Sequence, residues 1–404
     1  MGKAGRWVLG IAVGGATLWV LYSSFWGTLA ITPTPSDDKS TEKILAPLKI
    51  ASIAPCTKSL PIEARVDCFK EVFQKAVHEH GTPATLRALN IATTQDPDVL
   101  HHCHAITHVI GRTTYALTHD LSQAFAHCNA QCSSGCYHGT MEQLLTETSD
   151  LEAAIPTLCQ QGTREDEDRY TSFQCLHGLG HGFMIHLQHE LFASLEHCDL
   201  LPTESSQASC YGGVFMENIV AHDHHPSKYL QKADLHYPCT AVHERYKAAC
   251  YFGITDWFVK QNGFDFQQAF AECERVPDTY RFHCFRSMGR SINWHTDHDL
   301  EAAIAQCAIG APLRPPDGWP VSVPGICLMG AVLDLVNLDK SVDRAARLCA
   351  MAAQRDKRAC YAQLGEALSA VIADPEKQAA TCRRVAEERH VPLCRAAAHG
   401  RSSP

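Results

Sequence analysis

The chain has 404 residues, of which 45% are hydrophobic and 20% are charged, so a folded protein with a core is expected. Its formal net charge is −9 at pH 7. Because binding to a phosphate backbone needs clustered Lys and Arg, this balance argues against nucleic acid as a partner. The length is sufficient for two or three ordinary domains or for one long array of repeats.

The N-terminal segment is typical of a membrane anchor. Residues 7–31 contain no charged side chain, and about 20 apolar residues suffice to span a bilayer. Lys3 and Arg6 precede this run, so the positive-inside rule places residues 1–6 in the cytoplasm and the main body in the periplasm or outside the cell. A cleaved signal peptide is the alternative, although this run exceeds the usual signal core of about 7–15 residues. We expect an uncleaved transmembrane signal anchor, followed by a linker over residues 32–48.

The cysteines agree with export. The chain has 20 of them, and an even number in an exported protein indicates disulfide bonds. Most fall into closely spaced pairs, which we predict to be Cys56/Cys68, Cys159/Cys175, Cys198/Cys210, Cys239/Cys250, Cys273/Cys284, Cys307/Cys327, Cys349/Cys360 and Cys382/Cys394. Several pairings are open for the remaining four, Cys103, Cys128, Cys132 and Cys136. Pairing Cys128 with Cys136 would complete ten bridges together with a bond between the other two.

The spacing of these pairs predicts a helical-repeat fold. From Cys159 onward, the first cysteines of successive pairs lie 33 to 42 residues apart, a period typical of helical hairpins stacked in a solenoid. Good N-cap residues stand eight or nine positions before a first cysteine at Asp120, Asp150, Asp265, Asp299, Ser341 and Asp374. A short helix should therefore end at each first cysteine, and a longer apolar helix should start at the second.

The predicted fold is all-α: a right-handed α/α helical-repeat solenoid, stapled by disulfides, with an N-terminal transmembrane helix. In period and hairpin plan it resembles the tetratricopeptide and Sel1-like repeats, although neither class requires cysteine pairs. A glycine follows the second cysteine by three residues at Gly139, Gly178, Gly213, Gly253 and Gly330. Since a helical glycine costs about 1 kcal/mol relative to alanine, its recurrence predicts a close approach, either of the neighbouring helix or of the opposing cysteine pair.

Histidine is concentrated in one part of the chain. Of the 24 histidines, 17 lie between His101 and His243, and only two lie beyond residue 300. We therefore divide the folded part into His-rich repeats at 49–255, which contain the candidate metal site, and His-poor repeats at 256–404.

Three pairs of potential ligands with i,i+4 spacing lie on predicted helices of the His-rich part. This spacing points both side chains the same way, as two ligands of one ion require. His138 and His177 each stand two residues after a second cysteine, so equal offsets should bring their helix faces together. Glu217 lies one residue beyond the equivalent place in the next repeat. The predicted metal ligands are His104, His108, His138, Glu142, His177, His181 and Glu217.

Imidazole and carboxylate donors suit a transition metal ion such as iron, copper or zinc, while a calcium site would need more oxygen ligands. The design is similar to that of deoxyhypusine hydroxylase, where His-Glu pairs on helical repeats hold two irons, although this chain lacks that enzyme's series of His-Glu dipeptides. The sequence carries no His-Glu-x-x-His, Gly-x-Ser-x-Gly or Walker motif. Arg112 and Arg290, each directly after a glycine, could bind an anionic group, but a surface or salt-bridged arginine is the simpler interpretation.

Two classes of function follow from these patterns. The first is a membrane-anchored, exported metalloprotein with a His/Glu metal site, with oxidoreductase or hydroxylase activity as its enzymatic form. The alternative is a disulfide-stabilised helical-repeat scaffold that binds a protein partner on a concave surface, without catalysis.

The anchored topology is testable with reporter fusions. A reporter fused after Pro404 should be active if it works only outside the cytoplasm and inactive if it works only inside, because Lys3 and Arg6 hold the N-terminus in the cytoplasm. Activity of the cytoplasmic reporter would contradict this topology.

Overall fold

Every regular element in the described part of the chain is a helix. The computed structural model describes residues 53, 55–161, 169–223, 226–340 and 342–400, which all belong to one unit, Lys43–Pro404. The predicted anchor and linker lie outside the described residues. None of the described helices is both long and apolar enough to cross a membrane.

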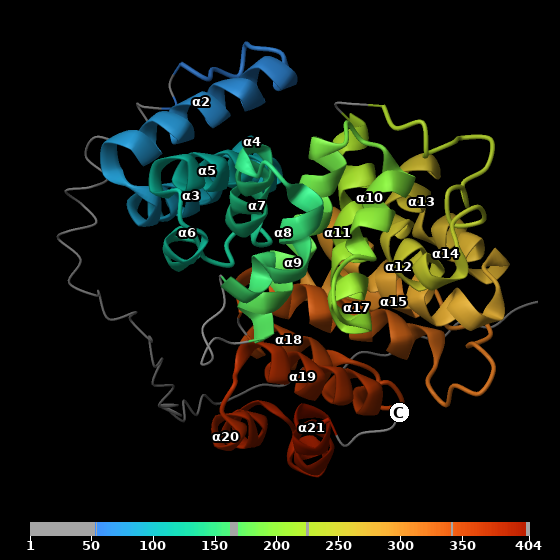
Figure 1. Ribbon diagram of the computed structural model, residues 1–404. Coiled ribbons are helices and arrows are strands. Elements are labelled where there is room, and N and C mark those ends of the chain that lie inside the picture. Colours follow the sequence, from blue (N-terminus) through green and yellow to red (C-terminus); the bar gives the residue numbers. More distant parts are fainter. Residues whose placement is uncertain (1–52, 54, 162–168, 224–225, 341, 401–404) are drawn as a thin grey trace, which may run out of the picture. The chain divides into compact units, whose positions relative to one another are not determined.

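The helices alternate between short and long over most of the chain (Figure 1). The N-terminal helices are α2 (Ile62–His80), α3 (Thr82–Gln95), α4 (Pro97–His101) and α5 (Cys103–Thr118). The shorter helices that follow are α6 (Leu121–His127), α8 (Leu151–Gln161), α10 (Leu191–Cys198), α13 (Thr255–Gln261), α14 (Phe266–Arg275), α16 (Leu300–Ala308), α18 (Val342–Met351) and α20 (Pro375–Val385), with 3₁₀ turns η2 (Ala221–Asp223) and η3 (Glu388–His390). Their partners are α7 (Gly135–Glu147), α9 (Arg169–His186), α11 (Glu204–Val220), α12 (Glu244–Gly253), α15 (Asp278–His295), α17 (Val323–Asp339), α19 (Lys357–Val371) and α21 (Val391–Ala398).

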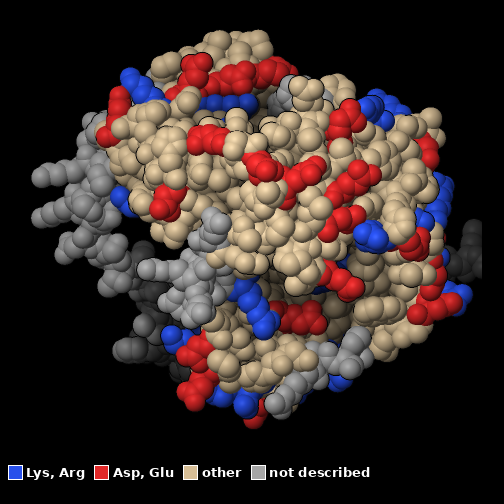
Figure 2. All heavy atoms as spheres, in the orientation of Figure 1, with Lys and Arg blue, Asp and Glu red and all other residues tan. Residues whose placement is uncertain are grey.

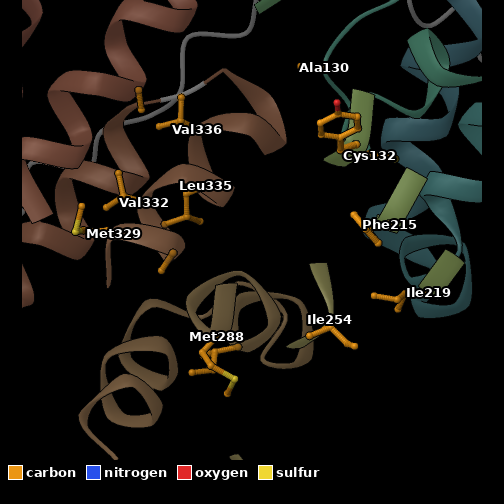
Figure 3. Close-up of a cluster of buried hydrophobic side chains, with 14 of the residues drawn as sticks. Ala130, Cys132, Phe215, Ile219, Ile254, Met288, Met329, Val332, Leu335 and Val336 are labelled. Atoms are coloured by element: carbon orange, nitrogen blue, oxygen red, sulfur yellow. The ribbon is translucent and has the colours of Figure 1, made fainter. Parts of the chain in front are cut away.

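The partner helices pack against one another in chain order. Helix α5 contacts α7, α7 contacts α9, and the series continues through α11, α12, α15, α17 and α19 to α21. The series also turns back on itself, because α9 contacts α19 and Tyr170 Oη of α9 donates to the Asn337 carbonyl of α17 at 3.0 Å. Figure 3 shows part of the resulting core, with Phe215, Met288 and Leu335 contributed by α11, α15 and α17. Helices far apart in the sequence therefore share one interior.

Ten disulfide bonds staple the helices, and they confirm all eight predicted pairs. The four remaining cysteines pair as Cys103–Cys132 and Cys128–Cys136, which resolves the pairing that the sequence left open. The paired Cα atoms lie 5.4 to 5.8 Å apart, within the ordinary range for disulfides. So many bridges indicate an oxidising, extracellular-type environment.

The predicted N-caps are largely confirmed. The side chain accepts from first-turn backbone N–H groups at Asp120, Asp265, Asp299 and Asp374. Asp150 accepts from the Ala153 N–H at 3.2 Å, and Ser341 lies outside the described residues. Each of these carboxylates satisfies N–H groups that would otherwise lack a partner at the start of a short helix.

The predicted start of the second helix is wrong. Helix α11 begins at Glu204, six residues before Cys210, and α9 likewise begins well before its cysteine. The reason is local: Thr203 and Ser206 form a capping box that starts α11 upstream of the disulfide. In α9 and α11 the second cysteine therefore lies inside the helix, just under two turns from its first residue, whereas Cys136 lies at the start of α7 as predicted.

Glycines allow several pairs of neighbouring helices to touch backbone to backbone. A Cβ atom placed on Gly139 would lie 1.9 Å from the His108 carbonyl oxygen, and one on Gly213 would lie 2.0 Å from the His177 oxygen. The contact is reciprocal, since a Cβ on Gly180 would lie 2.1 Å from the Cys210 oxygen. The same pattern joins α15 to α17 through Gly289 and Gly330. Of the two close approaches that the sequence allowed, these glycines make the one with the neighbouring helix.

Two adjacent glycines of α11 test this packing. Gly213→Ala should lower the free energy of unfolding by roughly 1–3 kcal/mol, because the added methyl group meets the backbone of α9. Gly212→Ala is the matched control, because its Cβ would make an ordinary contact of 3.4 Å with the His177 ring. That control should leave stability unchanged or raise it by up to about 1 kcal/mol. Denaturant unfolding with intact disulfides measures both, and equal effects would contradict the packing role.

Candidate metal centre

Five histidines from three consecutive helices meet in the interior. Their ring centroids lie between 4.5 and 6.4 Å apart in the contacts that join them. Two overlapping groups of three have potential ligand atoms within 4.8 Å of one another: His104, His108 and His138, and His138, His177 and His181. Glu142 and Glu217 adjoin the same cluster through hydrogen bonds to histidines. The structure thus brings all seven predicted residues together.

The first pair lies on α5, where His104 and His108 face each other through their Nε2 atoms. His104 Nδ1 donates to the Cys132 carbonyl at 2.8 Å, and a carbonyl can only accept. His108 Nδ1 is hydrogen-bonded to Glu142 Oε1 at 2.5 Å. With both Nδ1 atoms donating outward, the two Nε2 lone pairs point at each other across 3.0 Å.

The second pair lies on α9 and repeats this arrangement. His177 Nδ1 donates to the Ser209 carbonyl at 3.3 Å, and His181 Nδ1 is hydrogen-bonded to Glu217 Oε2 at 2.7 Å. The two Nε2 atoms are 3.3 Å apart. Both pairs therefore use backbone carbonyls and carboxylates on the outer side to aim two nitrogen lone pairs inward.

The separation of the Nε2 atoms fits two ligands of one ion. Nitrogen ligands at about 2.0–2.1 Å from a metal, with an angle between roughly 90° and 109°, lie about 2.9–3.4 Å apart. Both observed distances, 3.0 and 3.3 Å, fall in this range. Two facing lone pairs repel each other unless a cation or a proton lies between them, so the geometry favours a bound cation.

His138 on α7 lies between the two pairs and has one nitrogen available. Its ring stacks on His181 with centroids 4.5 Å apart and lies 5.4 Å from His104. Its Nε2 donates to Gln174 Oε1 at 3.1 Å, which leaves the lone pair on Nδ1. Among the described residues this buried Nδ1 has no hydrogen-bond partner. Since buried polar atoms are nearly always satisfied, His138 is suited to serve as a further ligand.

The two glutamates stand behind the histidines. Glu142 contacts both His108 and Arg112. Burial alone would raise the pKa of Glu142, but the charge and hydrogen bond of His108 and the charge of Arg112 hold it well below its usual value. Burial, followed by the charge of Glu142, raises the pKa of Glu217 to about 7. A carboxylate bonded to Nδ1 fixes the imidazole orientation and makes Nε2 a better donor to a metal.

Four of the histidines resist protonation. Burial lowers the pKa of His181 to about 3, with His108 as the next cause. Burial and neighbouring histidines hold the pKa values of His104, His138 and His177 well below the ordinary value. These imidazoles are therefore neutral near pH 7, the form that binds metal.

The structure also shows what the sequence missed. Gln174 completes the cluster as the partner of His138, and no spacing pattern pointed to this glutamine. Arg112 pairs with Glu142, which confirms the simpler interpretation of Arg112 as a salt-bridged arginine. The helix contacts make α5 and α9 equivalent. Gly111 of α5 lies against the Cys136 carbonyl of α7, as Gly180 of α9 lies against the Cys210 carbonyl of α11. Relative to these glycines, the pair on α9 stands one helical turn further along its helix than the pair on α5 does. The cysteine offsets had matched His138 with His177 instead.

Fold and site together define a helical, disulfide-rich protein whose buried His/Glu groups could hold a metal ion. Comparisons with protein families, curated proteins and solved structures found no match to this chain.

The buried neutral histidines predict that the metal-free protein loses stability in acid. The unfolded chain binds protons near pH 6.5, whereas the folded histidines bind them only at lower pH, so the unfolded state gains protons first. The free energy of unfolding should fall as pH drops from about 6.5 towards 3, by up to about 1.4 kcal/mol per pH unit for each histidine. His138→Gln should flatten this profile, while the exposed His78→Gln should not. A wild-type profile that stays flat between pH 7 and 5 would contradict the burial argument.

Proposed function

We propose that this protein is an exported metalloprotein that binds transition metal ions between its histidine pairs, with one position at each pair. A single observation carries the proposal. In each pair both Nδ1 atoms are bonded outward, so that two Nε2 lone pairs face each other across 3.0 or 3.3 Å. This is the spacing of two ligands that share an ion.

A metal ion explains the second pair better than a shared proton does. The pKa of His181 lies at about 3 and that of His177 well below its ordinary value, in both cases chiefly through burial. A proton held between them near pH 7 would therefore be disfavoured. The unpartnered Nδ1 of His138 supports the same conclusion, because it offers a third nitrogen to either position.

The donor set narrows the choice of ion. Five imidazoles supply nitrogen, while Glu142 and Glu217 act in this proposal as acceptors that orient His108 and His181 rather than as direct ligands. Nitrogen ligands suit iron, copper or zinc, and the inner side of the site offers too little oxygen for calcium or magnesium. Oxidoreductase or hydroxylase chemistry would require iron or copper, so a protein that holds only zinc would exclude that part of the proposal.

The surrounding protein fits an exported metalloprotein. Ten disulfides support an oxidising compartment, and the apolar run at residues 7–31 would anchor the folded part to the membrane. The packing of α5, α7, α9 and α11 in chain order supports a helical-repeat frame for the site, for which we propose a right-handed solenoid. The scaffold function on a concave surface is retained as the alternative if no metal is bound.

Metal content tests the proposal directly. Protein purified without a His tag from an oxidising compartment should contain a transition metal by inductively coupled plasma mass spectrometry. His104→Ala should remove the ion of the first pair and His181→Ala that of the second, because each change removes one of two facing nitrogens. His399→Ala, an exposed histidine at the end of α21, is the control and should change nothing.

The variants need a check of folding. Helicity and disulfide content should match the wild type in all three variants, because none of these side chains belongs to the hydrophobic core cluster. Wild-type protein that takes up no metal, or variants that retain the full amount, would contradict the proposal and favour the scaffold alternative.

A further inference from the structure

Two arginines on α15 form a second group of polar side chains, on a different helix from the histidines of α5, α7 and α9. Arg286 and Arg290 are half-buried, yet among the described residues neither forms an ion pair within 4.0 Å. Arg286 Nη2 donates to Gln363 Oε1 of α19 at 2.7 Å, while its buried Nε has no partner in the described part of the chain. Arg290 donates only a long bond of 3.4 Å to the Phe252 carbonyl.

Burial lowers the pKa of Arg286, and Glu366 is the carboxylate whose charge most opposes this effect, but Glu366 forms no ion pair with that arginine within 4.0 Å. Two further carboxylates nearby are bonded to other groups. Asp334 accepts from Asn293 Nδ2 at 3.0 Å and lies 3.3 Å from His298 Nε2. Asp256 pairs with His295 at 2.6 Å and with Lys260 at 3.2 Å. The two guanidinium groups are thus left with donor capacity that these acids do not use. The buried Nε of Arg286 is the clearest sign of this unused capacity, because a buried donor without an acceptor is costly.

The helix contacts show that this arginine pair has a counterpart in the metal centre. Gly289 of α15 packs on the Cys327 carbonyl as Gly180 of α9 packs on the Cys210 carbonyl. Relative to these glycines, Arg286 and Arg290 stand at the positions of His177 and His181.

The flanking residues follow the same correspondence. Phe252 stands two residues after Cys250, as His138 stands two residues after Cys136, and Asp334 stands four residues after Gly330, as Glu217 does after Gly213. In place of the three histidines and the glutamate of the second metal position, this position has a phenylalanine, two arginines and an aspartate. The same frame thus presents guanidinium donors instead of imidazole lone pairs.

We propose that Arg286 and Arg290 form an anion-binding site, which takes the carboxylate or phosphate group of a small ligand. Both guanidinium groups lie over the Phe252 ring, with their central carbons 5.8 and 4.8 Å from its centroid. One aromatic face thereby orients two planar donor groups that are one helical turn apart. Guanidinium groups match the paired oxygens of carboxylates and phosphates, and such charge-assisted bonds are among the strongest in proteins.

The charge of the arginines acts on the histidines. After burial and His181, the charge of Arg290 is the next cause that lowers the pKa of His177, so the two positions interact electrostatically. An anion bound at the arginines would weaken this effect of Arg290 on the second histidine pair. Arg112 is different, because it is already paired with Glu142. The anion site itself depends only on the arginines and not on bound metal.

Calorimetric titration of the full-length protein tests this site. Inorganic phosphate and succinate serve as probes, in a buffer without other oxyanions, with metal-free and metal-loaded protein. At least one probe should bind both forms, and Arg286→Gln and Arg290→Gln should each weaken that binding at least about tenfold. Tighter binding of phosphate would indicate a ligand with a phosphate group, and tighter binding of succinate would indicate a ligand with a carboxylate. The control Arg347→Gln removes an exposed arginine of α18 and should leave binding unchanged.

A second measurement on the wild type avoids any loss of folding in the variants. Phenylglyoxal modifies arginines, and peptide mass spectrometry can follow its reaction at Arg290. The bound probe should slow modification of Arg290 and leave that of Arg347 unchanged. Absence of binding by both probes up to about 10 mM, unchanged affinity in folded variants, or equal labelling with and without the probe would overturn the proposal. Because the titration includes metal-free protein, its outcome is independent of the metal hypothesis.

Discussion

Backbone contact between neighbouring long helices is the constraint on which the rest of the structure depends. At Gly139 and Gly213 there is no room for a side chain, since a Cβ atom would lie about 2 Å from a carbonyl oxygen of the preceding helix. Those oxygens belong to His108 and His177, so each contact is made by a residue of the candidate metal centre itself. The disulfides support the same contacts, because the carbonyl of Cys210 faces Gly180. The close approach sets how far apart the side chains on either side of each glycine lie, and this distance is short enough for imidazoles from three helices to meet.

This frame also explains how one repeat can have different chemistry from the next. The positions three residues before and one residue after the contact glycine carry polar side chains in both α9 and α15. On α9 these positions hold His177 and His181, whose lone pairs face each other. On α15 they hold Arg286 and Arg290, which stack on one phenylalanine and form no ion pair within the described residues. Only a few side chains differ, while the packing of the helices stays the same. In this proposal the decline of histidine along the chain reflects a change in which group is bound, and it does not require a change in fold.

The sequence predicted those features that depend on local spacing. The disulfides span 8 to 29 residues, and most join two helices of one hairpin, so their pairing follows from intervals along the chain. The histidine pairs were found because i,i+4 spacing is a property of a single helix. The side on which Glu142 and Glu217 lie could not be predicted, because it depends on how α7 and α11 are rotated against their neighbours. For the arginines the sequence singles out Arg290 as a possible anion ligand but not Arg286. The Phe252 ring over which both guanidinium groups lie belongs to another helix, and no local pattern encodes how α12 packs against α15.

In the proposed site, the two Nε2 atoms of each histidine pair face a position that one metal ion would occupy. Anomalous diffraction from crystals of the protein, collected on both sides of the absorption edge of the metal it contains, tests this most directly. We expect one anomalous peak at about 2.0–2.2 Å from the Nε2 atoms of His104 and His108, and a second at the same distance from those of His177 and His181. Glu142 and Glu217 should remain bonded to the Nδ1 atoms of His108 and His181. A metal bound by the glutamate oxygens, a metal elsewhere on the surface, or no peak between the histidines would contradict the proposed site.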